Sequence, residues 1–197
     1  MTAPRTVVIG LGNPLMGDDG VGLAALARLR DDWRLDGVEL VDGATWGLSL
    51  LPVIEDAERL VLVDAIAAHG TPGDIIELSR ERLPIYLSRK LSPHQVDLKD
   101  ALALAEWRGR LPSDVVAIGV QPGRVELGTE LSDAVQPQLG RLVRTVVEQL
   151  ERWGHTCVGV GVGVRVHGNH FIASGNEMIP VDSDPNSNSS RGHACTR

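Results

Sequence analysis

This chain of 197 residues has few cysteines and no long hydrophobic run. Its two cysteines, Cys157 and Cys195, both lie late in the sequence and imply no disulfide framework, so we expect a reducing environment. The N-terminal residues contain no apolar core of a signal peptide, and no apolar stretch has the length of a membrane span. These absences predict a cytoplasmic protein that does not enter a membrane.

The chain also has fewer basic residues than acidic ones. The chain has 19 Lys and Arg residues against 26 Asp and Glu residues, which gives a formal net charge of −7. Surfaces that bind nucleic acids or anionic membranes need an excess of Lys and Arg, so the charge balance argues against both kinds of partner. The chain also lacks a His-Glu-x-x-His helix, which argues against the zincin class of peptidases.

What the chain does contain is a regular alternation of apolar runs and amphipathic segments. Hydrophobic residues make up 43% of it, which is enough for the core of one domain. Alternation of this kind predicts an α/β fold, a three-layer sandwich with a mostly parallel central sheet and helices on both faces. The expected strands are 6–11, 37–41, 59–65, 74–78 and 114–120. The expected helices are 19–30, 47–54, one that starts at about residue 92, and one from about residue 132 to 153, which Pro137 should kink or delay.

The composition changes after Trp153. Val and Gly alternate over residues 158–164, and residues 181–197 are rich in Ser, Asn and Asp. A segment of the latter composition cannot bury enough apolar surface to become ordered. We therefore expect a domain over residues 1–153 and a C-terminal appendage over residues 154–197 that is largely irregular or disordered. The His and Cys residues of the appendage match no common zinc spacing.

The most informative stretch runs from Val7 to Gly22. An apolar strand ends there in a Gly-Asn-Pro turn, and Asp18 and Asp19 then open a helix. Open α/β sheets bind their ligands at the carboxyl ends of their strands. Adjacent side chains at a helix start point in different directions, so one carboxylate can cap the helix while the other faces the crevice above the sheet. We interpret Asp18 as favouring the helix N-terminus, and for Asp19 both roles are open.

Two further polar residues, Asp64 and His94, lie at comparable junctions. Asp64 follows the apolar run 60–63, where a carboxylate needs backbone N–H groups, an Arg or a cation as its partner. A loop-fixing role is the structural alternative. His94 follows Ser92 and Pro93, which are typical of a helix start. The positive end of the helix dipole favours the neutral ring that a metal requires, although a surface histidine at a helix start would have the same sequence context.

Together, Asp19, Asp64 and His94 form an O,O,N set that suits nickel, zinc or another first-row cation better than calcium. Three protein ligands leave coordination positions open for water or for a group of a partner. A loop with Thr45 and Trp46 follows the second strand. It either lines a substrate groove or packs Trp46 over the edge of the sheet.

These motifs resemble those of the [NiFe]-hydrogenase maturation endopeptidases. The resemblance covers about residues 5–152 and does not extend to the tail. It rests on several separated blocks, namely Gly10-Leu11-Gly12-Asn13 with Asp18-Asp19-Gly20-Val21-Gly22, Asp42-Gly43 with Thr45, Val63-Asp64-Ala65, and Leu91-Ser92-Pro93-His94-Gln95.

The resemblance implies an α/β sandwich and an endopeptidase that removes the C-terminal extension of a hydrogenase large-subunit precursor after nickel insertion. The metal-contacting and catalytic residues of the family fall on Asp19, Asp64 and His94, and some members have Glu in place of Asp19. These residues are implied to recognise nickel held in the substrate, so no permanent cofactor is expected. The precursor is the expected partner, and the protein itself is expected to be a monomer.

Other functions compete with this one. Residues 10–14 also resemble peptidyl-tRNA hydrolase, but the segment that carries the catalytic His of that family is missing, and the acidic charge fits tRNA poorly. A dinucleotide-binding fold is a weaker match because Leu15 occupies the third glycine position. A non-catalytic, nickel-dependent chaperone of the precursor would use the same three site residues. An enzyme would lower the mass of the precursor by the mass of the C-terminal peptide, whereas a chaperone would leave the mass unchanged.

Overall fold

The structure, a computed structural model, describes residues 4–83, 94–160, 164–167 and 170–173, with the side chains of residues 94–97 and of those beyond 160 left out. Contacts divide the chain into two units, Met1–Gly161 and Val162–Arg197. In the second unit, β8 (Val164–His167) pairs with β9 (His170–Ala173) in an antiparallel hairpin. The expected disorder of residues 181–197 lies outside the described residues.

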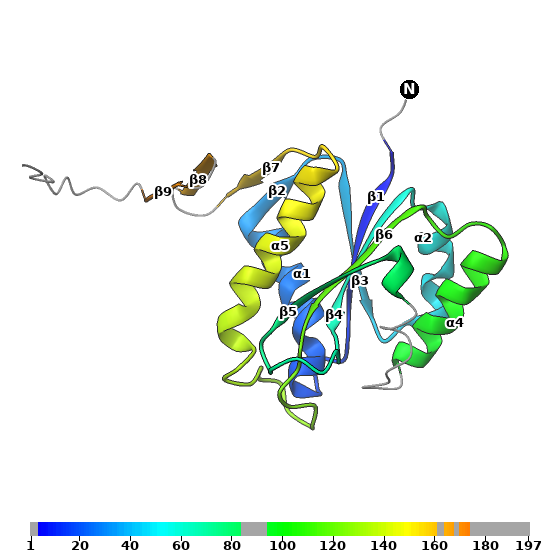
Figure 1. The fold of residues 1–197 in the computed structure, drawn as a ribbon, viewed down its shortest axis with the longest axis horizontal. Helices are drawn as coiled ribbons and strands as arrows, with labels where there is room; N and C mark the ends of the chain where they lie inside the picture. Colours follow the sequence, from blue (N-terminus) through cyan, green and yellow to red (C-terminus); the bar gives the residue numbers. More distant parts are fainter. Residues whose placement is uncertain (1–3, 84–93, 161–163, 168–169, 174–197) are drawn as a thin grey trace, which may run out of the picture. The chain divides into compact units, whose positions relative to one another are not determined.

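A five-stranded sheet forms the centre of the first unit (Figure 1). Its strands, in the spatial order β3-β1-β4-β6-β5, are β3 (Val38–Ala44), β1 (Thr6–Leu11), β4 (Arg59–Ala65), β6 (Asp114–Val120) and β5 (Ile75–Ser79). The first four are parallel, and β5 pairs antiparallel with β6 at one edge. The prediction of a mostly parallel sheet is confirmed. The bounds of β1, β4 and β6 agree with the expected ones because strands buried on both faces have near-continuous apolar runs.

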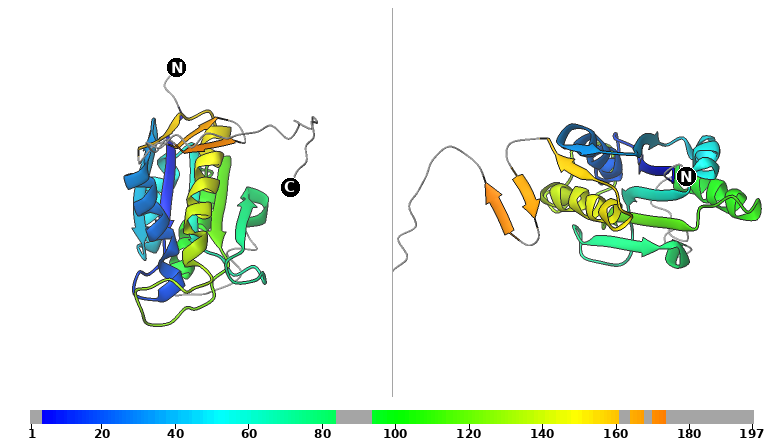
Figure 2. Two further views of the ribbon diagram at one scale, coloured as in Figure 1. Left: turned by 90° about the vertical axis from the view of Figure 1, so that its left-hand side faces the viewer. Right: turned by 90° about the horizontal axis from the view of Figure 1, so that it is seen from above.

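Helices cover both faces of this sheet (Figures 1 and 2). The helical elements are η1 (Gly17–Gly20), α1 (Val21–Asp32), η2 (Gly47–Leu50), α2 (Leu51–Asp56), η3 (Arg80–Arg82), α4 (His94–Trp107), η4 (Gln136–Gln138) and α5 (Leu139–Arg152). Successive side chains of a strand point to opposite faces. Accordingly, Leu60 and Leu62 of β4 join the core under α2 and α4, and Val61 and Val63 join the core under α1 and α5. The three-layer sandwich is confirmed.

The start of α5 follows a local sequence signal. Pro137 delays the last helix, because residues 136–138 form a short 3-10 turn before α5 begins at Leu139. The helix expected from about residue 92 is α4, which begins at His94. Ser92 and Pro93, its expected capping signals, lie outside the described residues. Within the described ranges, no helix has both the length and the apolarity to cross a bilayer.

The first unit contains a pair of short strands, one of which lies beyond the expected boundary at Trp153. Strand β2 (Trp33–Leu35) pairs antiparallel with β7 (Cys157–Gly159). Just before β7, His155 Nε2 lies 2.8 Å from Thr6 Oγ1 at the start of β1. Three-residue strands are too short to show a hydrophobic period, so this pairing could not be predicted from the sequence. The first unit therefore continues to Gly161.

The environment of Cys157 makes its thiol a poor nucleophile. Burial, with Glu151 and Asp36 nearby, raises the pKa of this thiol from 9.0 to about 11. Since only the thiolate reacts, we expect iodoacetamide at pH 8 to alkylate Cys157 about 100-fold more slowly in the folded protein than in urea. Mass spectrometry of the peptide that contains Cys157 measures both rates. Equal rates would contradict the prediction.

Candidate functional site

The order of the strands reverses between β1 and β4. From β1 the chain passes through α1 to β3 on one side, and from β3 through α2 to β4 on the other side of β1. Ligands of open α/β sheets bind outside the carboxyl ends of the strands at such a switch point. Asp19 follows β1, and Asp64 lies near the end of β4. The sequence-predicted carboxylates thus flank the switch point. The carboxyl ends of β1 and β4 lie at the lower edge of the sheet in Figure 1.

Glycines allow the first turn of α1 to sit directly on these strand ends. A Cβ at Gly22 would overlap the carbonyl oxygens of Leu11 in β1 and Val63 in β4. Gly12 has φ +117°, and a Cβ there would overlap the carbonyl oxygen of Asp19. The turn η1, which carries Asp19, also contacts β4. The close packing therefore brings the turn with Asp19 against the strand that carries Asp64.

Asp19 is completely buried, and its carboxylate is directed toward the loop after β1. Its Oδ2 accepts a hydrogen bond from the backbone N–H of Asn13 at 2.9 Å. The Oδ1 of Asn13 in turn accepts the N–H of Leu15 at 3.0 Å, which fixes the turn. Neither η1 nor α1 has a side-chain cap hydrogen bond. Asp19 itself lies in the first turn of η1, where a negative charge favours the helix start, and its carboxylate also fixes the loop after β1.

Asp64 is completely buried as well, and its Oδ1 accepts the N–H of Ala65 at 2.8 Å. Strand alternation puts Asp64 on the same face as Leu62, which is the face that α4 covers. Because α4 leads to the amino end of β6, it starts at the carboxyl edge, at His94. The start of α4 therefore lies on the same face of the sheet as Asp64 and at the same edge. The side chain of His94 lies outside the described ones, and among those no three His, Cys, Asp or Glu residues could hold a metal ion.

Asp18 lies in the first turn of η1, as expected for a residue that favours a helix start, but its carboxylate binds a distant loop instead of capping the helix. Its Oδ2 accepts hydrogen bonds from the N–H groups of Gly123 and Arg124, both at 2.8 Å, and from the Ser132 hydroxyl at 2.7 Å. Its Oδ1 accepts the N–H of Ser132 at 2.7 Å. Burial alone would raise the pKa of Asp18, but the bonds from Ser132, Arg124 and Gly123 outweigh it and lower the pKa. These partners lie more than 100 residues away, so no local sequence signal could reveal them.

The loop after β3 presents Trp46 to solvent. The side chain is 63% exposed, so the alternative in which it packs over the sheet edge is wrong. Ala44 has φ +35°, and its carbonyl accepts the N–H of Gly12 at 3.0 Å, which ties this loop to the end of β1. The exposed indole therefore belongs to a loop that is attached to the switch point.

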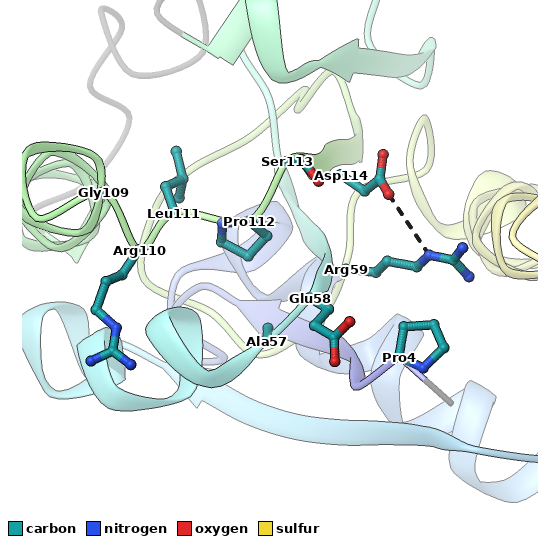
Figure 3. Close-up of a pocket in the computed structure, with 10 residues that line it drawn as sticks. All are labelled: Pro4, Ala57, Glu58, Arg59, Gly109, Arg110, Leu111, Pro112, Ser113 and Asp114. Atoms are coloured by element: carbon teal, nitrogen blue, oxygen red, sulfur yellow. Dashed lines mark ion pairs between the residues drawn. The ribbon is translucent and has the colours of Figure 1, made fainter. Parts of the chain in front are cut away.

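A surface cavity of about 390 Å³ lies at the opposite, amino edge of the sheet (Figure 3). Arg59 and Asp114, the first residues of β4 and β6, line it and form an ion pair at 3.8 Å. Arg59 also donates to the carbonyl of Trp153 at 2.6 Å. This cavity is lined by neither His nor Cys and by none of the predicted site residues. It is therefore separate from the candidate site.

Several known proteins of one kind are similar to this chain. A family profile described as hydrogenase maturation protease matches residues 24–149. The hydrogenase expression/formation protein HupD of Rhodobacter capsulatus is 36% identical over 153 residues, which cover 76% of this chain and 73% of that protein. The hydrogenase 2 maturation protease of Escherichia coli is 31% identical over 152 residues, which cover 76% and 93%. The solved structure of the hydrogenase maturating endopeptidase HybD from E. coli has a TM-score of 0.75 at 30% identity and covers 79% of this chain and 98% of its own.

Proposed function

Because this chain belongs to the hydrogenase maturation protease family, we propose that it cuts a [NiFe]-hydrogenase large-subunit precursor and removes its C-terminal extension after nickel insertion. The family makes the chain an endopeptidase. One structural observation supports the proposed use of the site. Two fully buried carboxylates, Asp19 and Asp64, flank the switch point of the sheet, the place where open α/β folds bind ligands.

Nickel recognition is the first proposed task of these carboxylates. Carboxylate oxygens and a neutral imidazole are suitable ligands for a first-row divalent cation. In the proposal, Asp19, Asp64 and His94 bind nickel that the precursor already holds through its own ligands. A precursor without nickel lacks this anchor and remains uncut. Nickel is thus part of the substrate, and the protein needs no permanent cofactor.

Peptide hydrolysis is the second proposed task. Nickel in the precursor supplies the Lewis acidity at the scissile bond. A site carboxylate accepts the proton of the attacking water as general base, and the reaction yields a new C-terminal carboxylate and a released peptide. Trp46 is available to contact the precursor beside the site, because its indole is exposed in a loop attached to Gly12. We place this reaction in the cytoplasm and expect a monomeric enzyme.

The test compares a nickel-loaded precursor with a nickel-free one. Each is mixed with the purified protein, and the mass of the precursor is followed over time. We expect the C-terminal peptide to be lost only from the nickel-loaded precursor. A stable complex of unchanged mass would replace the proposal with a binding function. Equal cleavage of both precursors would overturn the role of nickel.

A further inference from the structure

The buried carboxylate of Asp18 is the strongest polar anchor near the candidate site that the proposed reaction does not use. It accepts four hydrogen bonds of 2.7–2.8 Å from the β6–α5 loop, residues 121–135. An ionised carboxylate has enough lone pairs for four donors, whereas an amide has one acceptor oxygen and an NH₂ group that would face donors. Only the charged acid fits this arrangement, and it is buried despite the cost of removing a charge from water.

The same loop also holds η1 through backbone bonds. The N–H of Asp18 donates to the carbonyl of Arg124 at 3.0 Å, and the N–H of Gly17 donates to the carbonyl of Gly128 at 2.7 Å. The N–H of Gly128 donates back to the carbonyl of Leu15 at 2.9 Å. The β6–α5 loop therefore holds the first half of the turn, Gly17 and Asp18, and the residue Leu15 just before it.

On its other side, η1 touches the loop after β1. The carbonyl of Asp19 packs against Gly12, and the Asp19 carboxylate accepts the N–H of Asn13. The turn has four residues and no side-chain cap hydrogen bond. A 3-10 turn of this length has too few internal hydrogen bonds to hold its own orientation. The direction of the Asp19 side chain thus depends on the contacts that η1 makes with the loops on either side of it.

We propose that Asp18 is a positioning residue for precursor cleavage: by anchoring η1 to the β6–α5 loop, it sets the direction in which Asp19 points into the site. This inference rests on the proposed function. The two adjacent aspartates have different roles. Asp18 binds the protein's own loop, and Asp19 is held for the substrate. Loss of the anchor lets η1 rotate, which moves the Asp19 carboxylate relative to the bound precursor and slows the chemical step more than it weakens binding.

The experiment measures kcat and KM for a nickel-loaded precursor with folded variants, as judged by circular dichroism. We expect Asp18→Asn to lower kcat by about 10- to 100-fold with KM changed by less than about 3-fold, since misplacement of a reacting group by 1 Å costs up to about 100-fold. Ser132→Ala removes one of the four bonds and should lower kcat several-fold, and Ser132→Thr keeps both donors and should restore it. If Asp18→Asn does not fold, the two Ser132 variants decide.

A control variant tests whether a loss of stability alone lowers kcat. Leu142 is fully buried in α5, so Leu142→Ala lowers the melting temperature without touching η1, and its kcat should stay unchanged. A change in KM alone, or equal kcat values for Ser132→Ala and Ser132→Thr, would overturn the positioning role. Asp19→Ala is measured in parallel. If it is inactive while Asp18→Asn has normal kcat, only the positioning inference fails. If Asp19→Ala is fully active, the proposed function of the site fails.

Discussion

Replacement of Asp19 by alanine is expected to slow the processing of a nickel-loaded precursor by at least about 100-fold, the usual cost of removing a preorganised electrostatic partner from an active site. The variant should still fold. Among the bonds of Asp19, the substitution removes the one from the part-buried N–H of Asn13, which costs about 1–3 kcal/mol. His94→Ala should have the same effect on processing, because the proposal makes it the third nickel-binding side chain.

The measurement is the loss of the C-terminal peptide, followed by mass spectrometry under single-turnover conditions. Asp36→Ala is a matched control. It removes the same charge from the turn between β2 and β3, and within the described part of the chain its carboxylate accepts a bond only from Arg34, at 3.2 Å and exposed. The control should process the precursor at the wild-type rate. Normal cleavage by both Asp19→Ala and His94→Ala would refute the assignment of the site.

The second large effect concerns stability. Gly22→Ala should lower the free energy of unfolding by about 3 kcal/mol or more, because the new methyl group would overlap the carbonyl oxygens of Leu11 and Val63. These atoms belong to central strands and cannot move aside, so α1 would have to lift from the sheet. Helix propensity alone predicts the opposite sign, since Ala favours a helix interior by about 1 kcal/mol over Gly. Urea denaturation measures the difference.

Gly140→Ala provides the comparison for this variant. Gly140 lies in α5, is exposed, and has no atom within 4 Å of an added Cβ. There the same substitution should stabilise the protein by about 0.5–1 kcal/mol. If both variants shift the unfolding midpoint in the same direction, the close approach of α1 to the strand ends does not limit stability.

Much of the sheet could be predicted because burial on both faces leaves a simple sequence pattern. The strands β1, β4 and β6 consist of near-continuous apolar residues, and their predicted bounds agree with the structure. The edge strand β3 continues three residues beyond its predicted end at residue 41, because Asp42 and Gly43 interrupt its apolar run. The pairing of β2 with β7 joins segments more than 120 residues apart, and neither is long enough to show a period.

The candidate site was predictable to a similar degree. Asp64 lies near the end of one buried strand and Asp19 lies in the turn that follows another, so their position at the carboxyl edge follows from the alternation of strands and helices. The role of Asp18 did not follow, since its partners Gly123, Arg124 and Ser132 come from a loop that only the tertiary fold brings close. The exposure of Trp46 depended on the conformation of its loop, for which the sequence left both alternatives open.

The antiparallel pairing of β2 with β7 has a practical consequence for surface assays. Helix α1 runs from the carboxyl edge to the amino edge, and Val160, just after β7, donates its N–H to the carbonyl of Asp32 at the far end of that helix. Val160 therefore lies at the edge remote from Asp19. A tether attached at this edge would immobilise the enzyme on a sensor chip with the carboxyl ends of β1 and β4 directed away from the chip surface.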